Sequence, residues 1–148
     1  MGFRVKLLEP NARIPKKAHA TDAAFDLYSN EGIVLPPNSM ITVGTGVSVE
    51  IVPGYVGLVF SRSGHGKIRI SLANCVGVID SGYMGEIKVM LENLGNESYA
   101  INVGDRIAQL AIMPVSLMDL EEETKLTREE WESLTPRGSG GCGSSGVK

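Results

Sequence analysis

Residues 47–60, with the sequence VSVEIVPGYVGLVF, decide the fold class. Over residues 47–51 apolar side chains alternate with serine and glutamate, which is the period of a strand with one buried face. Residues 55–60 form a second β-type run, and Pro53-Gly54 between the two runs is a turn pair. The stretch therefore predicts two short strands separated by a turn.

The same pattern recurs along most of the chain. Many short strands at close spacing, with almost no helix between them, predict an all-β sandwich or barrel. One short helix is expected from Thr127 to Leu134, because Thr127 and Glu130 form a capping box and Pro136 follows. The other expected strands cover residues 3–8, 24–28, 32–35, 40–43, 86–91, 99–102 and 107–113.

Length and composition indicate a single small domain that has no nucleic-acid or membrane partner. The chain has 148 residues, of which 43% are hydrophobic, and a formal net charge of −3. This charge provides no attraction to nucleic acid or to an anionic membrane, and no apolar run approaches the roughly 18 residues of a membrane span. Cys75 and Cys142 form no metal or disulfide pattern, so we expect a cytoplasmic location.

The composition changes sharply after Pro136. Residues 137–148, RGSGGCGSSGVK, are rich in glycine and serine, so we expect a β domain over residues 1–136 and a separate C-terminal segment over residues 137–148. The segment is either an unstructured tail or a flexible arm that orders over an anion, because successive glycine N–H groups can form an anion-binding nest. The tail alone does not distinguish these readings.

Three segments carry polar side chains at strand ends. Arg62-Ser63-Gly64 follows the strand ending at residue 60 and is either a phosphate-binding turn or a solvated surface turn. Residues 74–85 predict a short apolar hairpin with Asn74 at one end and Asp80 at the other, where Asp80 either orients a water molecule or caps the turn. Residues 104–110 carry Gln109 within an apolar run, or form a turn with an Asp105–Arg106 surface pair.

In this order the segments resemble the five motifs of the trimeric deoxyuridine triphosphate nucleotidohydrolases (dUTPases), particularly those of bacteria and phages. The matching segments are residues 23–27 (AAFDL), 62–64 (RSG), 74–85, 104–110 (GDRIAQL) and 137–146. The resemblance covers nearly the whole chain, and it favours the arm over the unstructured tail. It implies a distorted β jelly roll, a homotrimer with shared active sites, and hydrolysis of dUTP to dUMP and pyrophosphate. Such an activity limits uracil incorporation into DNA and supplies dUMP for thymidylate synthesis.

The resemblance also implies a role for each motif residue. Asp80 would orient and deprotonate the water that attacks the α-phosphorus, and Asp26 would hold a Mg²⁺ ion through water molecules, which suits the ligand preference of this ion. Tyr83 would pack under the deoxyribose. Uracil recognition would fall to Asn74, Gly77, Val78 and Ile79, and phosphate binding to Ser63, Gly64, Gln109 and Arg62, the last from a neighbouring subunit. The arm would close over the nucleotide through Arg137, Cys142, Gly143, Ser144 and Ser145.

The sequence departs from the family pattern at His65 and at Cys142. His65 follows the second motif, where the family usually has leucine, and is either a structural residue or a catalytic base. Cys142 stands where the family arm carries a phenylalanine that stacks on uracil. Two other functions are considered: a dCTP deaminase of the same superfamily, which needs a glutamate base, and a nucleotide-gated regulatory protein.

Replacing Cys142 with phenylalanine should increase kcat/KM for dUTP. An aromatic ring stacked on a base contributes roughly 1–3 kcal/mol, whereas a thiol supplies a small part of this contact, so the expected gain is about 5- to 100-fold. Steady-state kinetics on three proteins, the Cys142 chain, the full-length Cys142→Phe variant and a chain that lacks residues 137–148, would measure the gain and compare it with the contribution of the whole arm. An unchanged kcat/KM in the full-length Phe variant would mean that the arm does not stack on the base.

Overall fold

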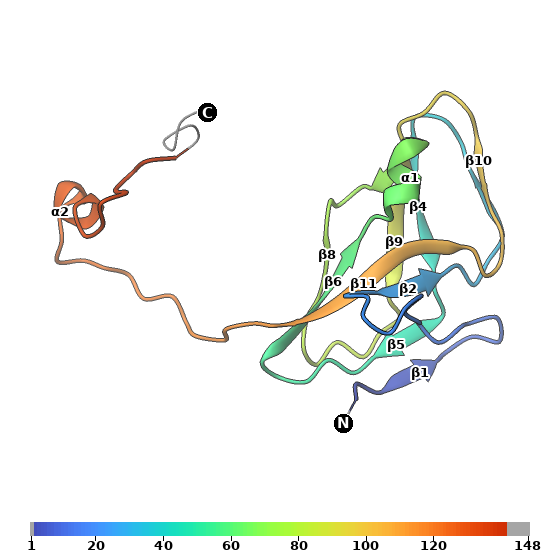
Figure 1. Cartoon of the computed structure of the whole chain (residues 1–148), viewed down its shortest axis with the longest axis horizontal. Coiled ribbons are helices and arrows are strands. Elements are labelled where there is room, and N and C mark those ends of the chain that lie inside the picture. Colours follow the sequence, from blue (N-terminus) through green and yellow to red (C-terminus); the bar gives the residue numbers. More distant parts are fainter. Residues whose placement is uncertain (1, 142–148) are drawn as a thin grey trace. The chain divides into compact units, whose positions relative to one another are not determined.

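The computed structural model describes residues 2–141 and divides the chain into two compact units, Met1–Leu117 and Met118–Lys148. The first unit contains all the strands of the described residues (Figure 1). These are β1 (Val5–Leu7), β2 (Phe25–Tyr28), β3 (Ile33–Leu35), β4 (Ser39–Gly44), β5 (Val47–Val49), β6 (Tyr55–Phe60), β7 (Ile70–Leu72), β8 (Gly77–Ile79), β9 (Lys88–Asn93), β10 (Tyr99–Ile101) and β11 (Arg106–Pro114).

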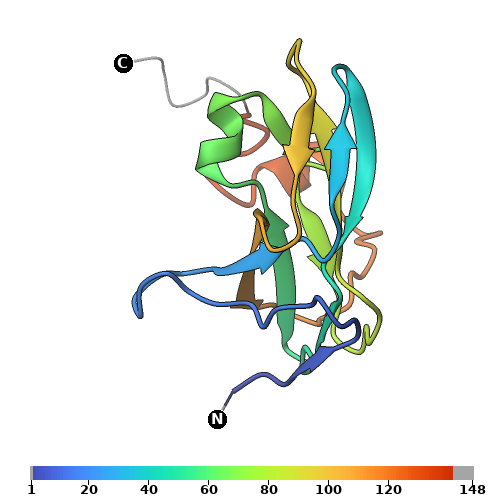
Figure 2. The same ribbon diagram turned by 90° about the vertical axis from the view of Figure 1, so that its right-hand side faces the viewer.

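All strand pairs are antiparallel and form two larger sheets and two ribbons. The larger sheets have the orders β2-β11-β6-β8 and β4-β9-β7, and the ribbons are β1-β5 and β10-β3, the latter pair running side by side in Figures 1 and 2. Inward side chains from both larger sheets form one hydrophobic core, so the predicted all-β fold, a distorted jelly roll, is confirmed. Its fully buried members include Leu27, Leu35, Val43, Ile87, Val89, Leu91, Ile107 and Leu110.

Strand β11 organises the first unit, because it pairs with β2 on one side and with β6 on the other. Its register with β2 shifts between Arg106 and Ala108, which marks a β-bulge. A bulge adds one residue to one strand and therefore reverses the alternation of side chains beyond it. The bulge lies at the end of β11 where the polar residues of the candidate site gather.

The segment 74–85 differs from the predicted hairpin. Strand β7, which precedes this segment, pairs with β9, whereas β8 pairs with β6, so the chain passes from one sheet to the other around Asn74. In the four-stranded sheet β8 is the edge strand. Within the segment, β8 is followed by a turn at Asp80–Tyr83, in which the Tyr83 N–H donates to the Asp80 carbonyl at 3.2 Å.

Two short helices complete the described residues. Helix α2 (Arg128–Glu132) in the second unit begins with the predicted capping box, in which Thr127 and Glu130 each accept from the other's backbone N–H. Helix α1 (Ser63–Lys67) was not predicted, because its sequence SGHGK has no apolar periodicity. Among residues 2–141, no helix has the length and apolar content needed to cross a membrane.

Candidate active site

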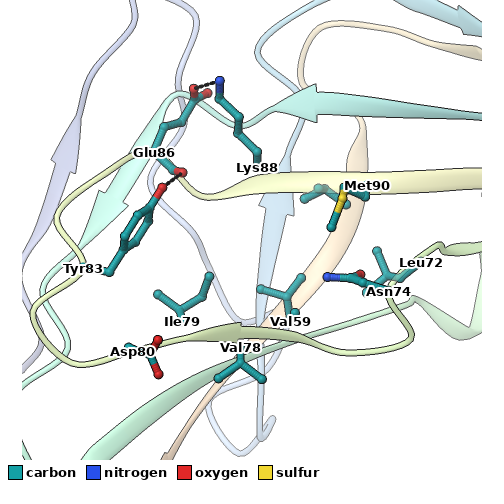
Figure 3. A pocket seen from close by; sticks show the side chains of 12 residues that line it. Val59, Leu72, Asn74, Val78, Ile79, Asp80, Tyr83, Glu86, Lys88 and Met90 are labelled. Atoms are coloured by element: carbon teal, nitrogen blue, oxygen red, sulfur yellow. Dashed lines mark hydrogen bonds and ion pairs between the residues drawn. The ribbon is translucent and has the colours of Figure 1, made fainter.

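A cleft of about 270 Å³ lies between β8 and the segment that leads into β9 (Figure 3). Asn74 and Asp80 stand at opposite ends of β8, and Met90 faces β8 from β9. The cleft is lined by Val59, Leu72, Asn74, Gly77, Val78, Ile79, Asp80, Tyr83, Glu86, Lys88, Val89 and Met90. It therefore combines an apolar floor with an amide and a carboxylate at its two ends, which suits a planar polar ligand.

The main chain of β8 is available to a ligand along one side. Within the described residues β8 is an edge strand that pairs with β6 alone, so N–H and C=O groups of its other side have no strand partner there. Gly77 brings this strand close to its neighbour, because a Cβ at this position would lie 3.1 Å from Val59 Cβ and 3.5 Å from Asn74 Nδ2. A side chain at position 77 would crowd the strand pair and the Asn74 amide.

Tyr83 is held at the rim of the cleft by its hydroxyl group, which donates to the Glu86 carbonyl at 2.9 Å. A Cβ at Gly85 would lie 2.5 Å from the Tyr83 hydroxyl oxygen, so glycine at this position is what allows the ring to pack there. The Glu86 carboxylate in turn pairs with Lys88 at 3.7 Å. The ring is therefore fixed on one side of the cleft, with 45% of the residue exposed.

A second polar cluster is centred on Asp26 in β2. The Asp26 side chain is only 6% exposed, and Oδ1 accepts from Arg62 Nε at 3.2 Å while Oδ2 accepts from Arg106 Nη1 at 3.4 Å. Gln109 Nε2 also donates to Oδ1, at 3.4 Å. Two guanidinium groups against one carboxylate leave an excess of positive charge, as a polyanionic ligand requires.

The bulge in β11 explains how Arg106 and Gln109 reach the same carboxylate. Residues three apart in a regular strand point to opposite faces, but the register shift between Arg106 and Ala108 reverses the alternation and turns both side chains toward Asp26. Asp105, which the sequence offered as a partner for Arg106, instead accepts from the Asn102 N–H at 2.8 Å. The surface-pair reading of this turn is therefore wrong.

Helix α1 carries Ser63 and Gly64, which are exposed, and His65, which is buried. His65 Nε2 lies 3.3 Å from the hydroxyl oxygen of Tyr99. Burial lowers the pKa of His65 below its ordinary value and the charge of Arg62 lowers it further, whereas Ile107 and Asp105 act in the opposite direction. Burial also raises the pKa of Tyr99. The structure therefore gives His65 a packed position within the fold.

The sequence model of the dUTPase family matches residues 10–146 of the chain. The deoxyuridine 5'-triphosphate nucleotidohydrolase of Mycobacterium marinum is 47% identical over 141 residues, which cover 94% of this chain and 91% of the relative. The enzyme of Corynebacterium jeikeium is 42% identical over 147 residues, which cover 98% of this chain and 93% of the relative.

This chain belongs to the dUTPase family.

Solved structures of phage dUTPases have the same fold. A dUTPase of Staphylococcus bacteriophage 80alpha with bound dUpNHpp superposes with a TM-score of 0.87 at 36% identity, and the match covers 99% of each chain. A dUTPase of phage phi11 of S. aureus, described with a structural Mg(II) ion, has a TM-score of 0.79 at 31% identity and covers 85% of this chain. These neighbours support the jelly-roll fold for this dUTPase.

The structure brings the sequence-predicted residues of this dUTPase together in two groups. Asn74, Gly77, Val78, Ile79, Asp80 and Tyr83 line the cleft, whereas Asp26, Arg62 and Gln109 form the second cluster. Arg137 lies in the second unit, where its Nε donates to the Gly140 carbonyl at 2.9 Å. Cys142, Gly143, Ser144 and Ser145 lie outside the described residues.

Sequence reasoning missed two features of this site. Arg106 joins the second cluster, and the signal for it was the run of residues 104–110, in which a glycine-containing turn precedes a strand. Lys88 and Met90 line the cleft opposite β8, because β7 and β8 diverge into different sheets and leave β9 beside the opening. Neither contact follows from local spacing in the sequence.

Replacing Asp26 with asparagine should lower the free energy of unfolding of this dUTPase. The variant leaves Arg62 and Arg106 without their shared carboxylate, and because the two arginine side chains are 23% and 49% exposed, the loss should be smaller than for a fully buried pair, about 1–3 kcal/mol. Urea denaturation would measure the change against an Asp119→Asn control, in which the aspartate is exposed. Equal urea midpoints of unfolding for the Asp26→Asn and Asp119→Asn variants would contradict the structural role of Asp26.

Proposed function

We propose that this chain hydrolyses dUTP to dUMP and pyrophosphate by attack of water at the α-phosphorus. The observation that carries the proposal is the cleft along β8, which joins an amide, an open strand edge and an exposed carboxylate within one short segment of a dUTPase-family chain. The relatives and neighbours that are named as deoxyuridine triphosphate nucleotidohydrolases, or that bind dUpNHpp, support the same substrate.

The edge of β8 suits uracil as a ligand. Uracil presents an acceptor, a donor and a second acceptor in one plane, and a strand edge presents N–H and C=O groups in alternation. The Asn74 amide at the end of β8 can add a donor or an acceptor to this set. Cytosine has an amino group where uracil has O4, so it would place a donor against a donor, and the uncompensated groups would disfavour it.

Asp80 is the proposed general base. It directly follows β8, and its carboxylate lies at the same end of the cleft as Tyr83 (Figure 3). With the uracil held along β8 and the deoxyribose on the Tyr83 ring, the α-phosphate would extend toward the Asp80 end of the cleft. Asp80 would accept the proton of the attacking water there, and pyrophosphate would leave from the opposite side of the α-phosphorus.

The second cluster is the proposed phosphate site. Arg62 and Gln109, together with Ser63 and Gly64 on α1, would bind the phosphates through charged and neutral hydrogen bonds. Arg137, Ser144 and Ser145, with Cys142 and Gly143 beside them, would complete the enclosure from the arm. Arg106 stands beside Arg62 at the same carboxylate and adds positive charge to this site.

Asp26 fits a magnesium ion that is bound through water. Among residues 2–141 no three His, Cys, Asp or Glu side chains gather as a metal cage. Mg²⁺ commonly keeps several waters and takes one or two carboxylates with substrate phosphates, which is the donor set that a single Asp26 and a triphosphate would supply. When bound, the ion would neutralise phosphate charge and hold the triphosphate in position for the in-line attack.

A homotrimer with shared active sites accounts for the separation of the two residue groups. The cleft lies on β8, one edge of the four-stranded sheet, whereas Asp26 lies on β2, the opposite edge, and the residues that line the cleft do not include Asp26, Arg62 or Gln109. A trimer would bring the cleft of one subunit to the phosphate site of the next. The dCTP deaminase alternative is not favoured, because the family model and the relatives are dUTPases.

Replacing Asp80 with asparagine should retain nucleotide binding and abolish most turnover. Removal of a positioned general base lowers kcat by about 10²- to 10⁴-fold. Pyrophosphate release from dUTP would measure kcat, and titration with dUpNHpp would measure binding, with Asp119→Asn as the matched control. A decrease of less than about fivefold in kcat would assign Asp80 to the turn rather than to the chemistry.

Mixed trimers test the shared site directly. When Asp80→Asn and Arg62→Ala chains are refolded together, some sites combine an intact cleft with an intact phosphate site, so part of the activity that each parent lacks should return. A mixture of Asp80→Asn with Asn74→Ala is the control, because both changes fall in the cleft and no site is then intact. Equal activity of the two mixtures, or a fully active monomer in light scattering, would contradict the shared site.

A further inference from the structure

Helix α1 has little intrinsic stability. Two of its five residues, Gly64 and Gly66, are poor helix formers, and its N-cap residue Arg62 makes no side-chain capping bond. A Cβ added at either glycine would contact nothing within 4 Å, so close packing does not require glycine there. A one-turn helix of this composition depends on tertiary contacts to remain folded.

His65 provides the buried contact. It is the buried residue of α1, 5% exposed, and its ring meets the Tyr99 ring edge to face with the centroids 5.7 Å apart. The Tyr99 hydroxyl lies 3.3 Å from His65 Nε2, so the two side chains meet through a polar contact as well as through their rings. Tyr99 in turn belongs to β10, where it pairs with the fully buried Leu35 of β3.

The anchored helix holds the main chain of Arg62. The Arg62 carbonyl accepts from the N–H groups of His65 at 3.0 Å and Gly66 at 3.3 Å, so the first turn of α1 sets the direction in which the Arg62 side chain leaves the chain. On the other side, Ser61 Oγ accepts from the Leu72 N–H at 2.9 Å and fixes the entry into the turn. Arg62 therefore lies between one fixed point at Ser61 and a second at His65.

We propose that His65 is a positioning residue for phosphate binding: its contact with Tyr99 anchors α1, and the anchored helix orients Arg62 and Ser63 toward the triphosphate. This inference rests on the proposed function for its substrate, but the anchoring itself is a property of the fold. The proposal gives a function to His65 and Tyr99, two side chains that contact neither the cleft nor Asp26.

Protonation of His65 would oppose this anchoring. Burial and Arg62 lower the pKa of His65, Asp105 raises it, and Tyr99 faces the ring as a neutral phenol. Because the folded-state pKa lies below the ordinary value, the folded state is destabilised relative to the unfolded state as pH falls from about 6.5 through the folded-state pKa. At the same pH the charged imidazole is repelled by Arg62 and disfavours its buried position, so α1 loosens and its hold on Arg62 is lost. Phosphate binding should weaken in the wild type through this loss of positioning.

The experiment compares Tyr99→Phe and His65→Leu with a Tyr55→Phe control, whose tyrosine lies at the other end of β6 and packs on Phe3. Hydrogen exchange of the full-length protein should show faster exchange of the amides of residues 63–68 in both variants, with β4 and β9 unchanged. Tyr99→Phe removes one oxygen atom, so it keeps the test valid if His65→Leu does not fold.

Binding measurements give the second readout. The Kd for dUpNHpp should rise about 2- to 10-fold in Tyr99→Phe, the range of a single hydrogen bond, while the Kd for dUMP stays within about twofold. The double variant should lose little more than His65→Leu alone, because both changes break one contact. The decrease of dUpNHpp affinity below pH 6.5 in the wild type should be reduced in His65→Leu.

Two results would overturn the proposal. Unchanged exchange of residues 63–68 in both variants would show that the pair does not anchor α1. An equal loss of affinity for dUMP and dUpNHpp would mean that the pair supports the fold generally rather than the phosphate contacts. Failure of the wild-type protein to hydrolyse dUTP would refute the proposed function instead, and hydrogen exchange would still test the anchor.

Discussion

The carboxylate of Asp26 is the constraint on which the rest of the site depends. It is almost fully buried, so it must be compensated by charge and hydrogen bonds, and it receives both from Arg62, Arg106 and Gln109. These partners come from β11 and from the end of β6, and Asp26 itself comes from β2. One buried charge therefore fixes the relative positions of three chain segments at one end of the sheet, and those are the segments that carry the proposed phosphate contacts.

The remaining chemistry depends on what the sheet leaves unpaired. Strand β8 ends the four-stranded sheet, and an unprotected edge would ordinarily favour association with another strand. Here β8 is only three residues long and is followed by the turn at Asp80, so the edge is too short to pair with a second chain over any distance. In the proposed binding mode the same short edge would accommodate one planar base, and Asp80 would lie beside the sugar end of that base.

Most of the strands were predictable because their cause is local. The alternation of apolar and polar residues over 47–51 predicted a strand, and the structure has β5 there, at Val47–Val49. Ser48, which the alternation placed on a polar face, is buried as well, and β7 (Ile70–Leu72) was not predicted. The structure divides the chain after Leu117, whereas the composition predicted a boundary after residue 136. No local sequence pattern marks the division at Leu117. The candidate site residues were predicted from the family motifs. Their grouping was not predicted, because the bulge before Ala108 and the divergence of β7 from β8 are set by pairing between distant strands.

Helix α1 shows the limit of sequence reasoning in its clearest form. The peptide SGHGK contains no periodic pattern, and its glycines indicate a loop. We infer that it forms a helix because the buried side chain of His65 contacts Tyr99, more than thirty residues further along the chain. A leucine at this position could fill a similar volume, but it could not hydrogen-bond the phenol of Tyr99. The proposed phosphate-binding turn of this chain therefore depends on a polar contact, as the cluster around Asp26 does, and the contact of His65 responds to pH where an apolar one would not.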